Sequence, residues 1–512
     1  MDQHPLLLPL LDKALERRKH LEPADIEDAA RSAGLPAALA WETANFYPRY
    51  QARGVRWLLV DEPVLRSRNF DELLSALKEA AVAAGVAAGT VYSYGLEAVG
   101  PALVVEDGPE RRVYAPVDLE GIRKLADGSE PGTLAELMPR GLARTGGWLL
   151  DSPGKLPDLS GAGGLIADVD SAGLRGLGGA LFPSGRKLAA VQAQESDVKY
   201  VVVNGDESEP GNFKDRWLME HNPRLVWAGA ALAARAVGAK EIIFYVRGEY
   251  TAALARVEAA RAELEASGYF EDLHTRTFRG GGLYICGEES ALLESIEGRR
   301  AEPRLKPPYP AEAGLFGRPT LVSNVETLAH MALISLRGAD SYREYSPKLF
   351  SISGDVRRPG VYELPLGTPL QEALETAGAS DTRAVLMGGA AGTFLRFPEN
   401  ASLPLDYDAP RALGDSIGPG ALMVFDSSRD LWAAAESVTA FFAHESCGRC
   451  FPCSLGTPHL HQLVLRWRQG EAQPELMRQL GETLEKGSLC GLGQAAPWAV
   501  RSLIDRFEEV AR

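Results

Sequence analysis

Four of the five cysteines in this chain lie near its C-terminal end, and their spacing constrains how that end can fold. Cys447, Cys450 and Cys453 occur at every third position, and Cys490 follows in a later loop. Three thiolates with this spacing can occupy three corners of a cubane, and the distant cysteine can complete the fourth, as in a [4Fe–4S] cluster. The pattern therefore predicts an iron–sulfur site and a role in electron transfer.

Other uses of these cysteines remain open at this point. Structural zinc usually takes two separated pairs of the form CxxC or CxxH, a pattern that is absent here. Disulfides would require an oxidising compartment, for which nothing else in the chain argues. Unliganded thiols are the third alternative. His459 and His461 lie close to the cysteines, but we expect them at the surface or in helix packing rather than on a metal.

Composition excludes several classes of partner. The 512 residues are 45% hydrophobic and 24% charged, with a net charge of −15. Such an acidic chain is unsuited to general nucleic-acid or anionic-membrane binding. No apolar run approaches the ~18 residues of a membrane span, and the apolar start at 5–9 does not resemble a signal peptide. We expect a cytoplasmic protein without direct membrane insertion.

The order of apolar patterns predicts a multidomain α/β protein in four parts. Residues 1–130 begin with helices and continue as a small β-α-β-type domain that ends in a linker at 127–132. Residues 135–340 alternate strands and helices, which predicts an α/β layer with a mostly parallel sheet. Residues 345–428 show short β runs around one helix, typical of a small α+β module. Residues 430–512 are helical throughout.

A glycine-rich stretch between Gly173 and Lys187 is the second informative feature. Closely spaced glycines let backbone N–H groups approach a phosphate, and a following lysine can neutralise its charge. The stretch matches neither a Walker A loop nor the GxGxxG of a Rossmann unit. It therefore predicts a phosphate-binding loop of another kind, with a plain flexible loop as the alternative.

Two acidic clusters support a nucleotide or flavin pocket. The segment 204–211 directly follows a predicted strand, and ligands of parallel α/β sheets bind beyond the carboxyl ends of strands. The segment 280–289 ends in Glu288 and Glu289, an acidic pair that could bind a ribose diol and repel a 2′-phosphate, which favours NAD over NADP. Each cluster alone could be a solvated turn, but together they indicate one pocket.

These segments resemble one family, the NADH-binding flavoprotein subunit of respiratory complex I. The resemblance runs through 173–187, 204–216, 247–250, 284–298, 303–310, 322–327 and 445–453, and covers roughly residues 135–512. It implies FMN, NAD(H) and one [4Fe–4S] cluster as cofactors. It also implies an α/β FMN-binding domain at 135–340, a ubiquitin-like, soluble-ligand-binding β-grasp module at 345–428, and a C-terminal helical bundle that holds the cluster.

The resemblance also implies the site residues. Hydride transfer between nicotinamide and flavin requires no protein acid or base, so no catalytic residue is expected. The cluster ligands would be Cys447, Cys450, Cys453 and Cys490. FMN would contact Gly176, Gly178, Gly179, Lys187, Asn204, Asp206, Glu207, Tyr284, Gly287, Glu288 and Asn324. NAD would stack on Phe182 and Tyr309 and meet Glu209 and Glu289. The remaining cysteine, Cys286, would be a packed residue beside the flavin.

The sequence departs from the family pattern at four positions. Leu177 stands where the family usually has Arg, and Leu181 where it has Gly. Ala190 occupies a place that is often aromatic, and Ser323 replaces one Asn of an Asn-Asn pair. Nucleotide affinity could differ for this reason, whereas the residues that frame the flavin are retained.

The first 130 residues resemble the thioredoxin-like [2Fe–2S] subunit that partners the flavoprotein. The segments 40–47, 70–77 and 94–99 carry this likeness. However, residues 1–285 contain no cysteine, and Val60, Leu65, Gly95 and Val99 stand about where the four ligands would be expected. A thiolate-ligated cluster is impossible in this domain. We expect a structural or docking role for it.

A fused domain without a cluster most resembles the β (diaphorase) subunit of cytosolic NAD-dependent molybdenum formate dehydrogenases. The implied partners are a catalytic molybdenum subunit and a separate [2Fe–2S] thioredoxin-like subunit, with electrons flowing to NAD⁺. The diaphorase subunit of NAD-reducing hydrogenases and the flavoprotein of complex I are the alternatives. A non-catalytic scaffold that has lost its flavin and a zinc-binding assembly module are hypotheses of different classes.

Overall fold

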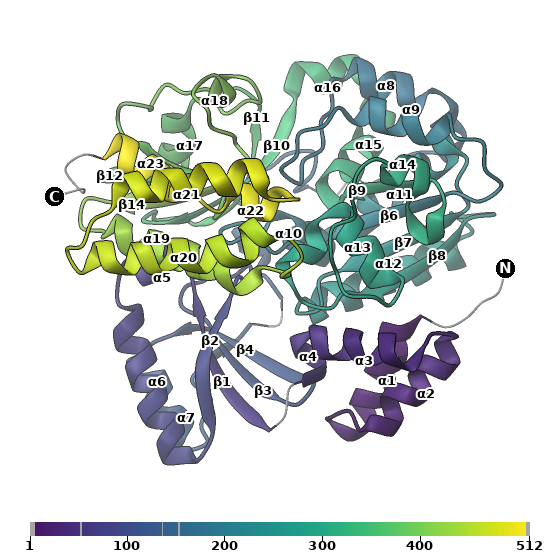
Figure 1. The fold of residues 1–512 in the computed structure, drawn as a ribbon. Coiled ribbons are helices and arrows are strands. Elements are labelled where there is room, and N and C mark those ends of the chain that lie inside the picture. The colour runs from purple at the N-terminus through teal and green to yellow at the C-terminus, as the bar shows by residue number, and fades with distance from the viewer. Residues whose placement is uncertain (1–5, 52–53, 136, 152–153, 508–512) are drawn as a thin grey trace.

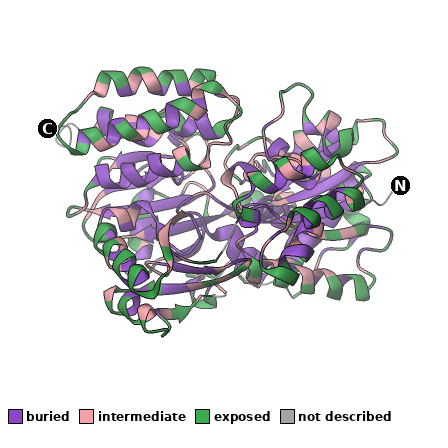
Figure 2. Cartoon of the chain, turned by 60° about the horizontal axis from the view of Figure 1, so that its bottom comes forward, coloured by how far each residue is buried: buried purple, intermediate pink, exposed green. Residues whose placement is uncertain are grey.

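The computed structural model describes residues 6–51, 54–135, 137–151 and 154–507 (Figure 1). In the described residues, helices alternate with strands, and the strands form three separate sheets, as the α/β prediction requires. Buried residues concentrate in the strands and on the inward faces of the helices, while exposed residues cover the outer faces (Figure 2). Among the described residues, no helix has the length and apolar character needed to cross a membrane.

The described residues begin with four helices. They are α1 (Leu7–Arg18), α2 (Pro23–Ala33), α3 (Ala37–Phe46) and α4 (Pro48–Gln51). Glu22 caps α2 and Pro23 occupies its first turn, where the missing N–H costs nothing. Helix α3 contacts the α/β domain: the Thr43 hydroxyl donates a 2.9 Å hydrogen bond to the carbonyl of Gly298.

A five-stranded sheet follows, in the order β2-β1-β3-β4-β5. Its elements are β1 (Val55–Asp61), α5 (Pro63–Arg66), α6 (Phe70–Ala84), β2 (Ala87–Tyr92), β3 (Leu103–Asp107), β4 (Glu110–Val117), α7 (Leu119–Ala126) and β5 (Gly132–Leu134). Strands β1 and β2 are parallel, and β3 is antiparallel to both β1 and β4.

This domain differs from the sequence expectation at one boundary. The composition of 127–132 predicts a linker, but Gly132 already belongs to β5, which pairs with β4. Asp127 and Gly128 of this segment do form a turn, yet the chain after it returns to the sheet. Local turn chemistry does not reveal such a return, because strand pairing depends on a partner elsewhere in the chain.

The central domain holds a four-stranded parallel sheet in the order β8-β7-β6-β9. Its strands are β6 (Tyr200–Gly205), β7 (Glu241–Val246), β8 (His274–Arg279) and β9 (Thr320–Asn324). The α-helices are α8 (Leu165–Ser171), α9 (Ser184–Gln192), α10 (Lys214–His221), α11 (Pro223–Val237), α12 (Thr251–Ala266), α13 (Glu289–Ile296), α14 (Pro310–Ala313), α15 (Val325–Arg337) and α16 (Ala339–Tyr345). Short 3-10 turns occur at η1 (Arg140–Leu142), η2 (Leu159–Gly164), η3 (Tyr284–Gly287) and η4 (Leu315–Gly317).

The third sheet has the order β11-β10-β14-β12-β13 and is mixed. Its elements are β10 (Pro347–Gly354), β11 (Gly360–Pro365), α17 (Leu370–Ala377), β12 (Thr382–Met387), β13 (Thr393–Arg396), α18 (Ala409–Ala412) and β14 (Ala421–Asp426). Only β10 and β14 run parallel. Leu370 and Leu374 of α17 pack into the same core cluster as Phe350 and Val385 of the sheet, so one helix covers one sheet face.

The C-terminal part is helical, as predicted. Its helices are α19 (Leu431–Glu445), α20 (Phe451–Arg468), α21 (Pro474–Gly487), α22 (Gly491–Ala495) and α23 (Trp498–Arg506). Every residue of α19 from Leu431 to Phe442 is buried, since the helix lies between the other helices and the rest of the molecule. The last predicted residues of this part, 508–512, lie outside the described residues.

Candidate functional site

The four C-terminal cysteines come together around one pocket. Cys447 and Cys450 lie in the loop after α19, Cys453 lies in the first turn of α20, and Cys490 caps α22. All four line a pocket whose other walls are formed by Ile285, Pro303, Ser446, Arg449, Leu489 and Leu492. The structure therefore brings together the whole predicted ligand set, including the cysteine that is distant in sequence.

The donor set and its surroundings fit an iron–sulfur cluster. Within the described part of the chain, no three or more His, Cys, Asp or Glu side chains form a site for a single metal ion; the thiols instead line the pocket. Burial raises the pKa of Cys453 to about 11 and that of Cys490 to about 12. Thiolates at these positions therefore depend on the positive charge of bound iron.

The two histidines near the cysteines take no part in this pocket. His461 Nδ1 lies 3.1 Å from the Thr439 hydroxyl, so it joins α20 to α19. Its pKa is lowered by burial, which favours the neutral ring. His459 is exposed. Both positions agree with the helix-packing and surface expectation.

Two predicted segments meet at the carboxyl edge of the parallel sheet. Asn204 at the end of β6 lies directly opposite Asn324 at the end of β9 in the parallel register. The Asn204 amide donates to the carbonyl of Gly287 at 2.9 Å, which draws the 280–289 segment to the same edge. Ligands of parallel α/β sheets bind at such edges.

The glycine-rich loop closes on itself before it enters α9. The N–H of Gly176 donates to the carbonyl of Phe182 at 2.8 Å, and Leu181 donates back to Gly176 at 3.1 Å. At Gly178 a Cβ would lie 3.2 Å from Asn324 Cβ, and Gly179 has a φ of +113°. Glycine therefore allows a tight approach to Asn324 at the first place and the backbone conformation at the second. The loop lies over the carboxyl edge of the sheet.

Buried carboxyl groups line this edge. Burial raises the pKa of Asp206 to about 8, although Arg247 opposes the shift, and Asp206 Oδ1 is buried without a hydrogen-bond partner. Burial likewise raises the pKa of Glu209 to about 7, against hydrogen bonds from Ala391 N–H and Tyr284 Oη. A buried unpaired oxygen is costly unless a ligand satisfies it. Asp206 thus fits a polar ligand such as a flavin ribityl chain.

Lys187 and Glu289 form one ion pair across the site. Lys187 Nζ lies 2.8 Å from Glu289 Oε2, and Lys306 Nζ lies 3.0 Å from Glu289 Oε1 and 2.9 Å from Glu288 Oε1. Burial alone would raise the pKa of Glu289, but the two lysines lower it to about 2. Glu288 also caps α13 by accepting from Ser290 and Ala291. Glu289 is therefore fully ionised at neutral pH.

The predicted stacking residues are exposed as such a role requires. Phe182 is 53% exposed and Tyr309 54% exposed, which is unusual for large aromatic side chains. Phe182 ends the glycine-rich loop, and Tyr309 caps α14. Both rings are therefore free to contact a planar ligand.

Glu207, which the resemblance assigns to FMN, is held by hydrogen bonds within the chain. Its two carboxylate oxygens accept from the Asn212 side chain and from the N–H groups of Asp215 and Arg216, at 2.7–2.9 Å. It therefore anchors the start of α10 beneath the loop. Burial raises its pKa, with Asp215 adding to the shift.

Sequence reasoning misses two residues of the site. Lys306 pairs with the acidic residues although it lies in a proline-rich stretch, and nothing in that stretch singles out this lysine. Glu445 accepts a 2.9 Å hydrogen bond from the N–H of Tyr284. It is two residues before Cys447 and is the first residue of the segment 445–453 that carries the resemblance, and these are the available signals.

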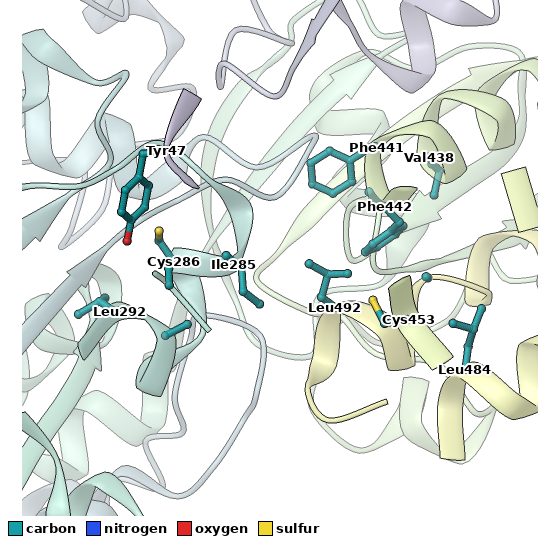
Figure 3. Packing of buried hydrophobic residues seen from close by; sticks show 14 of the residues in the cluster. Tyr47, Ile285, Cys286, Leu292, Val438, Phe441, Phe442, Cys453, Leu484 and Leu492 are labelled. Atoms are coloured by element: carbon teal, nitrogen blue, oxygen red, sulfur yellow. The ribbon is translucent and has the colours of Figure 1, made fainter. Parts of the chain in front are cut away.

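Tyr284 connects the two halves of the site. Its ring packs edge-on against Phe441 and Phe442 of α19, at centroid distances of 4.9 and 6.1 Å. The next residue, Ile285, lines the cysteine pocket. Figure 3 shows Ile285 between Cys286 on one side and Leu492 and Cys453 on the other. One short segment thus touches both the sheet edge and the cysteines, while Cys286 is fully buried as expected.

The N-terminal domain packs on the same region. Glu97 Oε1 accepts from the N–H of Gly211 at 2.8 Å, and Arg216 donates to the carbonyl of Tyr94 at 2.8 Å. A Cβ on Gly95 would lie 2.4 Å from the Tyr250 hydroxyl. At Gly95, one of the positions where a cluster ligand would be expected, the Tyr250 side chain of the central domain therefore leaves no room for a side chain.

Comparisons with known proteins identify these regions. Residues 169–333 match the family described as the Nuo51 FMN-binding domain, and residues 433–512 match the NADH-ubiquinone oxidoreductase-F iron-sulfur binding region. Residues 349–385 match the SLBB domain. The cofactors that belong to this architecture are FMN, a [4Fe–4S] cluster and NAD(H).

Two relatives and one solved structure illustrate the likeness. An NADH-quinone oxidoreductase subunit from Rhizobium meliloti (strain 1021) is 40% identical over 367 residues, covering 67% of this chain and 86% of the relative. The NADH-quinone oxidoreductase subunit from Aquifex aeolicus (strain VF5) is 39% identical, with 67% and 84% covered. A chain of an NAD⁺-reducing [NiFe]-hydrogenase in the air-oxidised state superposes with a TM-score of 0.87 and 31% identity, over 100% of this chain and 94% of that one.

Proposed function

Since this chain belongs to the family of the NADH-binding subunit of complex I, we propose that it is the diaphorase subunit of a multi-subunit NAD-dependent oxidoreductase. It exchanges electrons between NAD(H) and a partner subunit through FMN and one [4Fe–4S] cluster. The observation that carries the proposal is the segment 284–285: Tyr284 Oη donates a 2.7 Å hydrogen bond to Glu209 in the segment after β6, and Ile285 lines the cysteine pocket. Electron transfer between two cofactors requires such proximity.

The proposed cluster ligands are Cys447, Cys450, Cys453 and Cys490. Bound FMN supplies the chemistry of exchanging a hydride with nicotinamide and single electrons with a cluster. The chain supplies binding and orientation. In this proposal the backbone of 176–179 and the ammonium of Lys187 hold the flavin phosphate, and Asp206 and Asn204 hold the ribityl hydroxyls.

The same proposal assigns the coenzyme to the outer side of the pocket. Phe182 and Tyr309 stack on planar rings of NAD(H), and Glu209 and Glu289 contact its polar parts. The ionised Glu289 repels a 2′-phosphate, which favours NAD(H) over NADP(H). Because no protein acid or base moves a proton in the hydride step, ring stacking at reactive distance is the main contribution of these residues.

Formate is the proposed electron source. The support is the fused N-terminal domain, which carries no cysteine in residues 1–285 and so cannot hold a thiolate-ligated cluster. The proposed partners are a molybdenum subunit that oxidises formate and a [2Fe–2S] thioredoxin-like subunit. We also propose a cytoplasmic location, supported by five free cysteines, which suit a reducing compartment.

Molecular hydrogen is the second candidate source. The observation that favours it is the likeness to the NAD⁺-reducing [NiFe]-hydrogenase chain, which extends over the whole chain and therefore includes the N-terminal domain. The NADH-quinone oxidoreductase relatives match only 67% of this chain. A comparable N-terminal region thus occurs in at least one chain of an enzyme that reduces NAD⁺.

Two measurements test the proposal. The anaerobically purified chain should show flavin and broad iron–sulfur absorption that bleaches with NADH; a folded, iron-replete but colourless protein would leave the scaffold hypothesis standing. The complex purified from its native cells should contain molybdenum and reduce NAD⁺ with formate. Nickel together with hydrogen-dependent NAD⁺ reduction would instead establish the second candidate.

A further inference from the structure

Arg300 lies where three parts of the molecule meet. It follows α13 in the central domain, and its guanidinium is 3.4 Å from Glu42 Oε1 of α3 and 3.1 Å from Glu302 Oε1. It also donates a hydrogen bond of 3.4 Å to the carbonyl of Cys447. The guanidinium carbon of Arg300 also lies 4.8 Å from the ring centre of Phe46. One cation therefore connects the N-terminal helices to the cysteine loop.

The backbone that carries Arg300 is held by the N-terminal helices. The Thr43 hydroxyl donates to the carbonyl of Gly298, and the Tyr47 hydroxyl donates to the carbonyl of Arg299 at 3.0 Å. Gly298 has a φ of +79°, and a Cβ there would lie 2.8 Å from Leu7 Cβ. The N-terminal helices and the residue that follows α3 thus fix the turn from which Arg300 extends.

A second ion pair extends the connection to the cysteine loop. Glu302 Oε2 lies 2.8 Å from the guanidinium of Arg449, which is located between Cys447 and Cys450. Glu42, Arg300, Glu302 and Arg449 also line one surface pocket beside the cysteines. Glu302 pairs with both Arg300 and Arg449, and Arg300 also donates to the backbone carbonyl of Cys447, a proposed cluster ligand.

We propose that Arg300 is a positioning residue for the iron–sulfur cluster, and that the N-terminal helices set the reduction potential of the cluster through it. Guanidinium is permanently charged, and a cation or hydrogen-bond donor beside a cluster stabilises the more negative, reduced form. The inference rests on the proposed ligation of the cluster by the four cysteines. It assigns a task to an N-terminal segment that itself holds no cluster.

The expected effect is on the potential rather than on stability. The Arg300 side chain is 35% exposed, and exposed ion pairs contribute little to folding stability. By contrast, its contact with Cys447 places a fixed charge next to a ligand of the redox centre. A change in reduction potential without a comparable loss of folding would therefore be the signature of this role.

An EPR-monitored redox titration of the purified complex tests the proposal. Arg300→Gln should lower the midpoint potential of the cluster, while Arg299→Gln, which removes the same charge from the same turn but contacts Glu294 and Glu297 instead, should shift it much less. The midpoint potential of Arg300→Lys should be closer to that of the wild type, because lysine keeps the positive charge. Equal potentials for wild type and Arg300→Gln, or equal shifts for both glutamine variants, would overturn the proposal. Absence of any cluster signal in the wild type would instead refute the cysteine ligation.

Phe46→Leu tests the part played by the N-terminal helices, because it changes no charge. Phe46→Leu should lower the midpoint potential of the cluster, but by less than Arg300→Gln does. In a protein that already carries Arg300→Gln it should cause no further shift, as expected when one residue acts through another. An unchanged potential in Phe46→Leu, or fully additive shifts, would overturn the role of the helices. Iron content and thermal unfolding of each variant verify that folded, loaded protein is compared.

Discussion

Leu181 holds a backbone conformation that suits glycine. Its φ is +54°, in the left-handed region that costs a residue with a Cβ about 1–2 kcal/mol. The family resemblance predicts glycine at this position. Leu181 therefore adopts a left-handed conformation close to Gly179, which also has a positive φ.

Replacing Leu181 by glycine should relieve this strain. Leu181→Ala loses nearly the same part-buried side chain and keeps the strain. The relief of about 1–2 kcal/mol exceeds the added entropy cost of a glycine, about 0.5–1 kcal/mol, so Leu181→Gly should be more stable than Leu181→Ala by roughly 0.5–1 kcal/mol. Thermal unfolding of the purified chain measures it. Leu305 is the matched control, since it is exposed and its φ is not positive, and there glycine should be less stable than alanine. If glycine is the less stable at both positions, Leu181 is not strained.

Asp206 should make the stability of the flavin-free protein depend on pH. Its folded pKa is raised to about 8 from 3.8 by burial, so between these values the folded state binds a proton that the unfolded state releases. Its stabilising contribution is therefore complete below the unfolded pKa and is lost as pH rises through about 8.

Asp206→Asn removes this titration while it keeps the shape of the protonated acid. The stability of the wild type relative to the variant should therefore fall steadily from pH 5 to pH 8. The difference in free energy of unfolding should change by at most about 1.4 kcal/mol per pH unit, and the difference in melting temperature should fall with it. Thermal unfolding at four pH values in that range measures the difference. A constant difference would show that Asp206 titrates alike in both states.

At the scale of elements, the cluster loop depends on close packing between α20 and α22. A Cβ on Gly493 would lie 2.4 Å from Ser488 Oγ and 2.9 Å from Cys453 Cβ, whereas at Gly491 nothing lies within 4 Å. The turn that presents Cys490 is thus pressed against the turn that presents Cys453. Two distant cysteines can share one pocket because no side chain separates these helices.

Gly493→Ala should therefore damage the cluster site, and Gly491→Ala should not. The added methyl group must displace Cys453 or Ser488, and overpacking of this kind costs about 1–3 kcal/mol. Iron content and iron–sulfur absorbance of the anaerobically purified variants are the measurements. Equal iron content in the two variants would contradict the packing argument.

At the scale of the molecule, the N-terminal domain is joined to the helical bundle by buried charges. Arg66 on α5 lies 2.5 Å from Asp61 and 3.4 Å from Glu436 of α19, and the side chains of all three are at most 12% exposed. Tyr92 at the end of β2 packs 6.1 Å from the ring of Phe441. Phe441, which contacts Tyr284, therefore packs against the N-terminal domain as well.

Arg66→Met should loosen this interface. It leaves two buried carboxylates without this cation, and breaking a buried ion pair costs about 3–5 kcal/mol. Hydrogen exchange should accelerate in both β1 and α19, two elements far apart in the sequence. Arg123→Met, on the exposed side of α7, is the control. Acceleration confined to the N-terminal domain would show that the pair does not join the two domains.

Features that depend on local spacing can be recognised in the sequence alone. The cysteine run at 447–453, the strand at 241–246 and the helix at 370–377 appear in the structure where the sequence indicates them. The same is true of the glycine-rich loop. These features follow from residue type and period along a short stretch of chain, which a sequence displays directly.

Which side chains meet depends instead on the folded arrangement. The pairing of Lys187 with Glu289, the hydrogen bond from Tyr284 to Glu445, and the contact of Arg300 with Cys447 each join residues at least 100 positions apart. The return of β5 to the first sheet is of the same kind. Nothing local distinguishes such residues from solvated charges or linkers, because the partner that gives each its role comes from a different element of the fold.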